Sequence, residues 1–268
     1  MRPVIYQIFT RLYGNKTKNN KPNGTLQENG SAKMNDITAT KLQRISRMGF
    51  THVWFTGLIE HATQTDHTAF GISKDHPAVV KGKAGSPYAI KDYYDIDPDL
   101  AVSVPDRMKE FKALLNRTHK AGLKMVIDFV PNHVARHYHS DAAPKGVEDL
   151  GEKDDTTKGF DPQNNFYYLP GQQLRTDFAR SAAKSEPYIE LPAKATGNIL
   201  KPKLSCICRF KIKPLCNRIN TCPDSRSAFI NFCSNCINII TCIDFYIYAV
   251  NFYNAVFICL PPGSTLGT

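Results

Sequence analysis

Cysteine is absent from the first 205 residues, and all eight cysteines lie between Cys206 and Cys259. Residues 201–268 also lack Glu, Gln, His, Met and Trp, and their seven Lys and Arg residues are offset by only two acids, Asp224 and Asp244. This segment therefore supplies half of the formal net charge of +10. Because the basic surplus is concentrated there without a known nucleic-acid-binding motif, we expect no nucleic-acid partner.

Long apolar runs are also missing from the sequence. No run reaches the ~18 residues that cross a membrane, so we expect no membrane-spanning segment. The N-terminus has no apolar core followed by small residues, as a secretion signal requires, and we therefore expect a cytoplasmic protein. The hydrophobic fraction of 42% and the charged fraction of 22% are ordinary for a globular chain. Nothing in the sequence indicates an oligomeric state.

Residues 199–268 show no sustained helical or alternating apolar pattern with caps and turns. In a folded domain the apolar pattern, the caps and the turns all agree with one structure. They do not agree in this segment, which favours an out-of-frame, spliced-on or disordered tail. Two alternatives stay open. Cys206 with Cys208, and Cys233 with Cys236, have spacings that zinc ligands use, although no His is available to join them. An even number of clustered cysteines also suits a disulfide scaffold, which the missing secretion signal disfavours.

The first 198 residues alternate between strand-like and helix-like patterns. Short apolar runs rich in β-branched and aromatic residues predict buried strands at residues 4–9, 51–56 and 123–130. A helix is predicted before the second strand, and Gly49 is expected to end it. Its apolar residues at helical spacing are Leu42, Ile45 and Met48.

A second predicted helix follows a loop of some forty residues. Ser103 is its expected N-cap, with Pro105 in the first turn, and Gly122 is its expected end. Its apolar face consists of Met108, Phe111, Leu114 and Leu115. The resulting order of strand, helix, strand, helix, strand builds a parallel sheet with right-handed crossovers.

Loop lengths favour a TIM barrel over a doubly wound sheet. The loops after the second and third strands are long, whereas the returns from helix to strand are short, and barrel enzymes build their active face from strand-to-helix loops. No Gly-x-Gly-x-x-Gly sequence follows the first strand, which counts against a dinucleotide-binding fold. We therefore predict an α/β protein, an incomplete TIM (β/α)8 barrel with the first three β/α units and an inserted domain after strand three.

The third predicted strand ends in the sequence Asp-Phe-Val-Pro-Asn-His at residues 128–133. An apolar strand that ends in Asp and continues into Pro-Asn-His resembles a short motif of the α-amylase family, glycoside hydrolase family 13. Residues 4–9 resemble that family's first barrel strand, and residues 48–55 resemble its passage from helix one to strand two. Residues 87–98 resemble the segment that carries its sugar-stacking tyrosine. The four segments occur in the family's order and cover about residues 3–198.

The resemblance implies an α-glucan or a maltooligosaccharide as the partner. Tyr88 would stack on the sugar ring at the cleavage site, because an aromatic face suits the apolar C–H face of a pyranose. His133 would donate a hydrogen bond to a sugar hydroxyl. Asp92 would help to position an arginine of a later catalytic motif, and Asp128 would be a structural acid at the barrel mouth. Asn132 matches a position that ligates a structural calcium in many relatives, through an amide oxygen that suits a hard cation.

The resemblance also divides the chain. Residues 1–135 would hold the first three barrel strands, residues 136–198 a loop-rich inserted domain, and residues 199–268 the Cys-rich tail. In the family, the nucleophilic Asp follows an arginine at the end of strand four, the acid Glu ends strand five and a further Asp ends strand seven. None of those strands is evident, so we assign no catalytic residue. Asp177 has the Arg-x-Asp form, but no apolar strand precedes it, and Glu190 is the last Glu of the chain.

We therefore predict a truncated or frame-disrupted α-amylase-type glycoside hydrolase that is inactive in this chain. A non-catalytic glycan-binding protein that uses Tyr88 and His133 is one alternative, and a zinc-binding Cys-rich tail is another. The outer edge of the third strand would lack its parallel neighbour. Its unpaired backbone groups would then be exposed as a template for aggregation.

Overall fold

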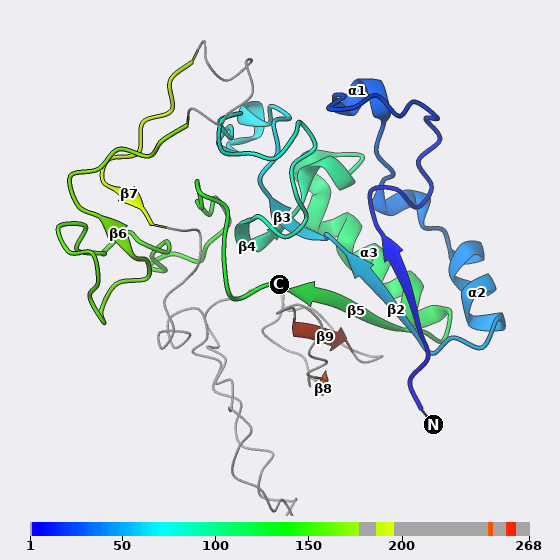
Figure 1. Ribbon diagram of the computed structural model, residues 1–268. Coiled ribbons are helices and arrows are strands. Elements are labelled where there is room, and N and C mark those ends of the chain that lie inside the picture. Colours follow the sequence, from blue (N-terminus) through cyan, green and yellow to red (C-terminus); the bar gives the residue numbers. More distant parts are fainter. Residues whose placement is uncertain (1, 177–185, 196–245, 249–255, 261–268) are drawn as a thin grey trace, which may run out of the picture.

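A computed structural model of the chain describes residues 2–176, 186–195, 246–248 and 256–260 (Figure 1). Its centre is a five-stranded sheet in the order β1-β2-β5-β9-β8. Strands β1 (Ile5–Phe9), β2 (His52–Thr56) and β5 (Lys124–Phe129) run parallel, as their sequence patterns predicted. Their carboxyl ends therefore meet at one edge of the sheet.

Strand β1 is less buried than its composition predicted. Of its five residues only Ile8 is buried, and Ile5 is 47% exposed. Within the described residues, β1 has a hydrogen-bonded neighbour on one side only, β2, so its position at the edge of the sheet explains the exposure. Val53 and Phe55 of the neighbouring β2 are fully buried, as expected for a central strand.

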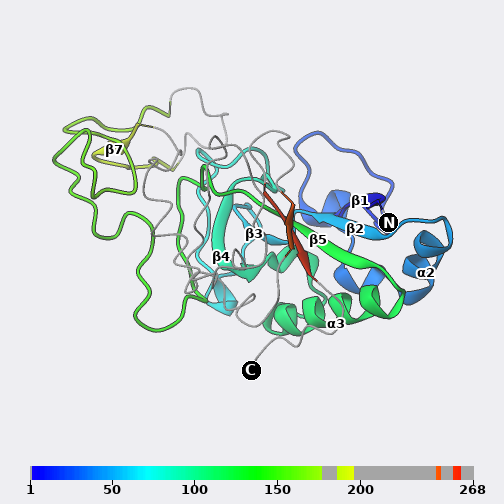
Figure 2. The ribbon, with the colours of Figure 1, turned by 90° about the horizontal axis from the view of Figure 1, so that it is seen from below.

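Two helices, α2 (Ala39–Arg47) and α3 (Arg107–Lys120), lie side by side along one face of the sheet (Figure 2). Leu42 and Ile45 of α2 are buried, because apolar residues at helical spacing share the face that meets the sheet. The prediction that Met48 belongs to this face is wrong, because Met48 is the C-cap residue and is 52% exposed. Gly49 follows with a φ of 91°, which ends the helix.

The start of α3 differs from the prediction. Ser103 precedes a short 3-10 turn, η4 (Val104–Asp106), and the α-helix begins only at Arg107. Ser103 does not cap through its side chain, which donates instead to Oδ2 of Asp106 at 2.9 Å. The backbone N–H groups of Val102 and Ser103 donate to the Glu110 carboxylate, at 3.0 and 2.8 Å to Oε1. A carboxylate one turn into the helix therefore fixes the incoming chain.

The predicted forty-residue loop between β2 and α3 is more ordered than expected. It contains β3 (Ile59–His61) and β4 (Ile90–Ile96), which pair antiparallel with an irregular register, and the 3-10 turns η2 (Thr68–Phe70) and η3 (Pro98–Leu100). All seven residues of β4 are buried, including Lys91, Asp92 and Asp95. Charged residues within a buried strand give no apolar alternation, which is why the sequence pattern did not predict it.

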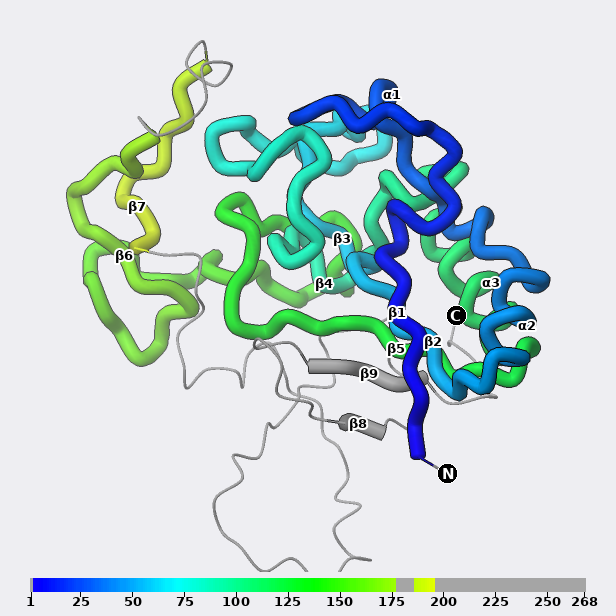
Figure 3. The backbone as a smooth tube through the Cα atoms, turned by 45° about the vertical axis from the view of Figure 1, so that its right-hand side comes forward, coloured from blue at the N-terminus to red at the C-terminus, as the bar shows by residue number. Residues whose placement is uncertain are grey.

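The remaining short elements lie in the long connections. The first connection holds α1 (Leu26–Asn29) and η1 (Met34–Asp36). The connection after β5 holds a two-stranded sheet of β6 (Tyr168–Leu169) and β7 (Ala193–Lys194), and this part lies to one side of the central sheet, away from α2 and α3 (Figure 3). None of the described helices is long and apolar enough to cross a membrane.

The outer edge of β5 is not open, contrary to the prediction. Strand β9 (Val256–Leu260) pairs with it antiparallel, with Ile127 opposite Ile258, and β8 (Tyr246–Tyr248) pairs with β9 (Figure 1). An edge of unpaired N–H and C=O groups accepts a strand in either direction, because main-chain hydrogen bonds do not depend on sequence. The tail that we expected to be irregular thus supplies two strands, and the described residues form no closed barrel.

Phe111 of α3 tests the packing of the helix layer. Its side chain is fully buried, so Phe111→Ala should lower the free energy of unfolding by about 3–5 kcal/mol through lost burial and a residual cavity. Urea unfolding of the purified chain measures this change. Val102→Ala is the control, because Val102 is 67% exposed and its truncation should change stability by less than about 0.5 kcal/mol. Equal effects of the two variants would contradict the packing described here.

Candidate functional site

Gly57 connects the carboxyl ends of β2 and β5. Its backbone N–H donates to Oδ1 of Asp128 at 3.2 Å, and Asp128 itself is only 5% exposed. On the other side of β2, the hydroxyl of Thr10 donates to the Thr56 carbonyl at 2.9 Å. The three parallel strands are therefore tied together where they end, and the loops that follow them start from a fixed frame.

Gly57 also brings a distant loop against this edge. It has a φ of 77°, and a Cβ at this position would lie 2.8 Å from Cβ of Pro87. Only glycine adopts this backbone without cost and leaves room for the proline. The loop that holds Pro87 and Tyr88 therefore packs directly on the end of β2. Tyr88 keeps 38% of its surface exposed there.

The structure brings three of the predicted residues together at this edge. The His133 imidazole is hydrogen-bonded to the backbone of Tyr88, and burial lowers the pKa of His133 despite that bond. Burial and then the nearby Asp128 carboxylate raise the pKa of Tyr88. The hydroxyl of Tyr93 on β4 donates to the Val130 carbonyl at 2.5 Å, which holds the chain just before His133. A partly exposed aromatic ring thus lies beside a neutral imidazole and a buried acid.

Burial raises the pKa of Asp128 to about 6. Hydrogen bonds from the backbone, Gly57 among them, and from the Trp54 side chain lower it in part, because they stabilise the charged form. Asp128 therefore changes charge near neutral pH, in direct contact with the backbone that fixes the site.

Asp92 lies in a different cluster from Tyr88. It is fully buried on β4, where Oδ1 accepts from the Tyr94 N–H at 2.7 Å, and Oδ2 accepts from the N–H groups of Asp141 and Ala142 at 3.1 and 3.3 Å. Burial raises the pKa of Asp92 to about 6, although the Tyr94 N–H opposes the shift. Asp92 thus holds the chain that follows β5 against β4, close to Glu60 and Asp141.

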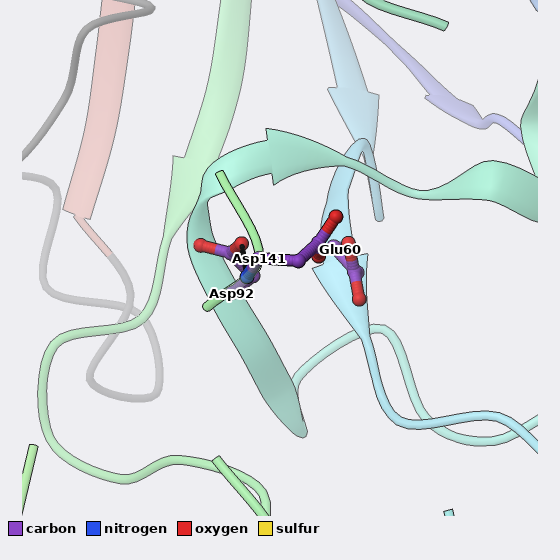
Figure 4. A group of neighbouring side chains, drawn as sticks. All are labelled: Glu60, Asp92 and Asp141. Atoms are coloured by element: carbon purple, nitrogen blue, oxygen red, sulfur yellow. Dashed lines mark hydrogen bonds between the residues drawn. The ribbon is translucent and has the colours of Figure 1, made fainter. Parts of the chain in front are cut away.

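Sequence analysis did not select Glu60 or Asp141. Glu60 lies on β3, which follows directly after β2. Its place just beyond the carboxyl end of a parallel strand was the one feature of the sequence that could have marked it as a candidate. Asp141 lies in a polar stretch with many acids, where nothing in the sequence distinguishes it. Ligand oxygens of Glu60, Asp92 and Asp141 all lie within 4.8 Å of one another (Figure 4).

The amide oxygen of Asn132 is buried and has no hydrogen-bond partner among the described residues. A buried acceptor without a partner costs free energy unless a cation or a water molecule binds to it. An amide oxygen is a hard ligand, so Asn132 fits the calcium position that its place in the sequence predicted.

Two other predictions concern residues outside the described part of the chain. Asp177, in the Arg-x-Asp sequence, is not described, although Arg175 before it is. The cysteines of the proposed zinc or disulfide tail are also outside it, except that Cys259 lies in β9.

The fold and this edge define a class of protein. Parallel strands alternate with helices, and an exposed tyrosine, an imidazole and acids collect where the strands end. This is the arrangement of α/β enzymes that bind their substrate at the carboxyl ends of the strands. Residues 7–174 match the family described as the alpha amylase catalytic domain. The chain belongs to this α-amylase family of glycoside hydrolases.

The curated relatives include a cyclomaltodextrin glucanotransferase and a maltase. Cyclomaltodextrin glucanotransferase of Bacillus sp. (strain 38-2) is 25% identical over 184 residues, which cover 65% of this chain and 24% of that protein. Maltase 1 of Drosophila virilis is 26% identical over 183 residues, 67% of this chain and 23% of that protein. The chain thus spans about a quarter of the length of these relatives.

Two solved structures are similar to part of this chain. A maltogenic α-amylase of Thermotoga neapolitana is 25% identical, with a TM-score of 0.34, and the match covers 51% of this chain and 25% of that one. A γ-cyclodextrin glucanotransferase of the alkalophilic Bacillus clarkii is 22% identical, with a TM-score of 0.40, over 74% of this chain and 27% of that one.

The raised pKa of Asp128 predicts how stability depends on pH. The pKa of Asp128 is about 6 in the folded chain and about 3.9 in the unfolded chain. The contribution of its protonated carboxyl group to folding stability is therefore complete below pH 4 and is lost as pH rises through 6. This carboxyl should lower the free energy of unfolding by up to about 3 kcal/mol between pH 4 and pH 7. In Asp128→Asn, urea unfolding at several pH values should show a shallower decline. The other buried acids with raised pKa values, Asp92, Asp95 and Glu60, supply what is left.

Asp66→Asn is the control for this measurement. Asp66 is exposed, and hydrogen bonds from Thr68 lower its pKa, so its contribution is lost as pH falls rather than as it rises. This variant should keep the decline between pH 4 and pH 7. A decline of full size in Asp128→Asn would contradict the assignment.

Proposed function

We propose that this chain supplies the α-glucan-binding part of an α-amylase-type active site. The observation that carries the proposal is the position of Tyr88, a partly exposed ring at the carboxyl ends of the parallel strands, hydrogen-bonded through its backbone to His133. The ring offers an apolar face to a pyranose, and a ring side chain loses little entropy when it binds. We further propose that β1, β2 and β5 are the first three strands of a (β/α)8 barrel.

His133 would orient the sugar beside Tyr88. Burial keeps its imidazole neutral at neutral pH, with a single ring N–H that is bonded to the Tyr88 backbone. The other ring nitrogen would accept a hydrogen bond from a sugar hydroxyl without the cost of burying a charge. Asp128 would act on the sugar indirectly, because its carboxylate binds Gly57 and thereby fixes the turn on which the Tyr88 loop packs. Asn132 would hold a calcium ion that stabilises the loop after β5, with its otherwise unpartnered amide oxygen as one ligand.

We also propose that the chain binds without cleaving. Retaining glycosidases need a carboxylate nucleophile and a second carboxylic acid about 5 Å apart, both in contact with the sugar. The resemblance assigns those residues to strands four, five and seven, and the matched residues 7–174 include only three of the parallel strands. The carboxylate beside Tyr88, Asp128, is only 5% exposed, and Asp92 and Glu60 are 0% and 1% exposed, so none of the three is free to contact a substrate. The parent activity would be hydrolysis or transfer at α-glucosidic bonds.

Binding of maltoheptaose tests the first proposal. Calorimetric titration of the full chain should give measurable heat, and Tyr88→Ala should weaken the affinity about tenfold, since one stacked ring is worth about 1 kcal/mol or slightly more. Phe70→Ala is the matched control, because Phe70 is an exposed aromatic residue on η2, 48% exposed. Equal affinities of the Tyr88 and Phe70 variants would rule out the stacking role.

Turnover of a p-nitrophenyl maltooligosaccharide tests the second proposal. We expect no release of p-nitrophenol above the buffer rate by the purified chain. Measurable turnover that Asp177→Ala abolishes would refute the proposal and would identify the Arg-x-Asp sequence as the nucleophile motif.

A further inference from the structure

Three carboxylates from separate parts of the chain converge beside the central sheet. Glu60 comes from β3, Asp92 from β4 and Asp141 from the segment after β5, and one oxygen of each lies within 4.8 Å of the others (Figure 4). Glu60 and Asp92 are also register partners in the β3–β4 ladder. The backbone therefore places their side chains together, and the third carboxylate is brought in by the loop.

Glu60 has no partner that explains its burial. Its side chain belongs to a residue that is 1% exposed, and neither carboxylate oxygen has a hydrogen-bond partner among the described residues. A buried carboxyl group in this state loses its hydration without compensation. Burial and the neighbouring Asp92 raise the pKa of Glu60, which reflects the same unfavourable surroundings.

Two described cations near the cluster are engaged by Asp97, Asp95 and Asp141. His61 is paired with Asp97, with 2.9 Å between Nδ1 and Oδ2, and this pair outweighs burial to raise the pKa of His61. Arg107 donates to Asp95 from both Nε and Nη2 and lies 3.1 Å from Oδ2 of Asp141. Neither cation makes a described hydrogen bond or ion pair with Glu60 or Asp92. The cluster is therefore short of positive charge on the side of Glu60.

The oxygens are arranged as ligands of one ion. Two ligands of a calcium ion, each about 2.4 Å from the metal, are at most about 4.8 Å apart, and the three carboxylates lie within this limit of one another. Backbone N–H groups fix both oxygens of Asp92. Oδ2 accepts two of them, whereas Oδ1 accepts only one and keeps a second lone pair for a metal. The side chain of Asp141 is 20% exposed, so the cluster has an opening through which water can complete the coordination.

We propose that Glu60, Asp92 and Asp141 form a binding site for a hard divalent cation, with calcium as the best fit. The ion would stabilise the fold by joining β3, β4 and the segment after β5, three parts of the chain that lie far apart in sequence. This site is separate from Asn132 and does not require the chain to bind a glucan.

Calorimetric titration of calcium chloride into the full chain, after treatment with a chelator, tests the site. Glu60→Gln and Asp141→Asn should each weaken one binding event at least tenfold. Asp155→Asn should bind as the wild type does, because Asp155 lies outside the cluster, its side chain is 41% exposed, and its partners are Thr157 and Lys158. Asn132→Ala should also leave this event unchanged, which separates it from any ion at Asn132.

Thermal unfolding separates lost binding from a damaged fold. Calcium should raise the melting temperature of the wild type above its value in EGTA. Glu60→Gln in EGTA should melt at or above the wild type in EGTA, because an amide replaces a buried acid, and calcium should no longer raise its melting temperature through this site. Absence of calcium binding to the wild type at millimolar concentration would overturn the proposal. So would Glu60→Gln and Asp141→Asn variants that bind calcium as tightly as the wild type.

Discussion

The hydrogen bond from the Gly57 N–H to the Asp128 carboxylate fixes the functional edge of this chain. It joins the residue after β2 to the end of β5. The positive φ of Gly57 turns the chain, and the missing Cβ leaves room for Pro87 to pack on it. Tyr88 follows Pro87 directly, and His133 bonds to the Tyr88 backbone. The turn at Gly57 therefore determines where the aromatic ring and the imidazole of the proposed glucan site lie.

The same edge concentrates negative charge in a region that excludes water. Asp128, Asp92 and Glu60 are buried within reach of the strand ends, and burial raises the pKa of each. Backbone N–H groups compensate Asp128 and Asp92, whereas Glu60 has no such donor in the described chain. This difference divides the acids into two kinds. Asp128 and Asp92 organise loops, and Glu60 is left for an ion.

The regular part of the fold could be predicted from the sequence because its signals are local. The three parallel strands and the apolar faces of α2 and α3 follow from apolar spacing and flanking glycines, and α3 deviates only at its start, where Glu110 replaces the expected serine cap. The family could also be predicted, because residues 128–133 are contiguous in sequence. Strands β3 and β4 could not, because Lys91, Asp92 and Asp95 are buried by tertiary contacts that reverse the usual preference of charged residues for the surface.

By itself, the sequence determined the order of strands and helices, the α-amylase resemblance, and the selection of Tyr88, Asp92, Asp128, Asn132 and His133 as candidates. Only the tertiary structure decided how these residues are grouped: Tyr88, Asp128 and His133 at one place, and Asp92 with Glu60 and Asp141 at another. It also decided that β9 pairs with the edge of β5. The physical reason is the range of the interactions. Apolar periodicity and motifs are properties of neighbouring residues, whereas carboxylate clusters and strand pairing depend on residues that are distant in sequence and meet only after folding.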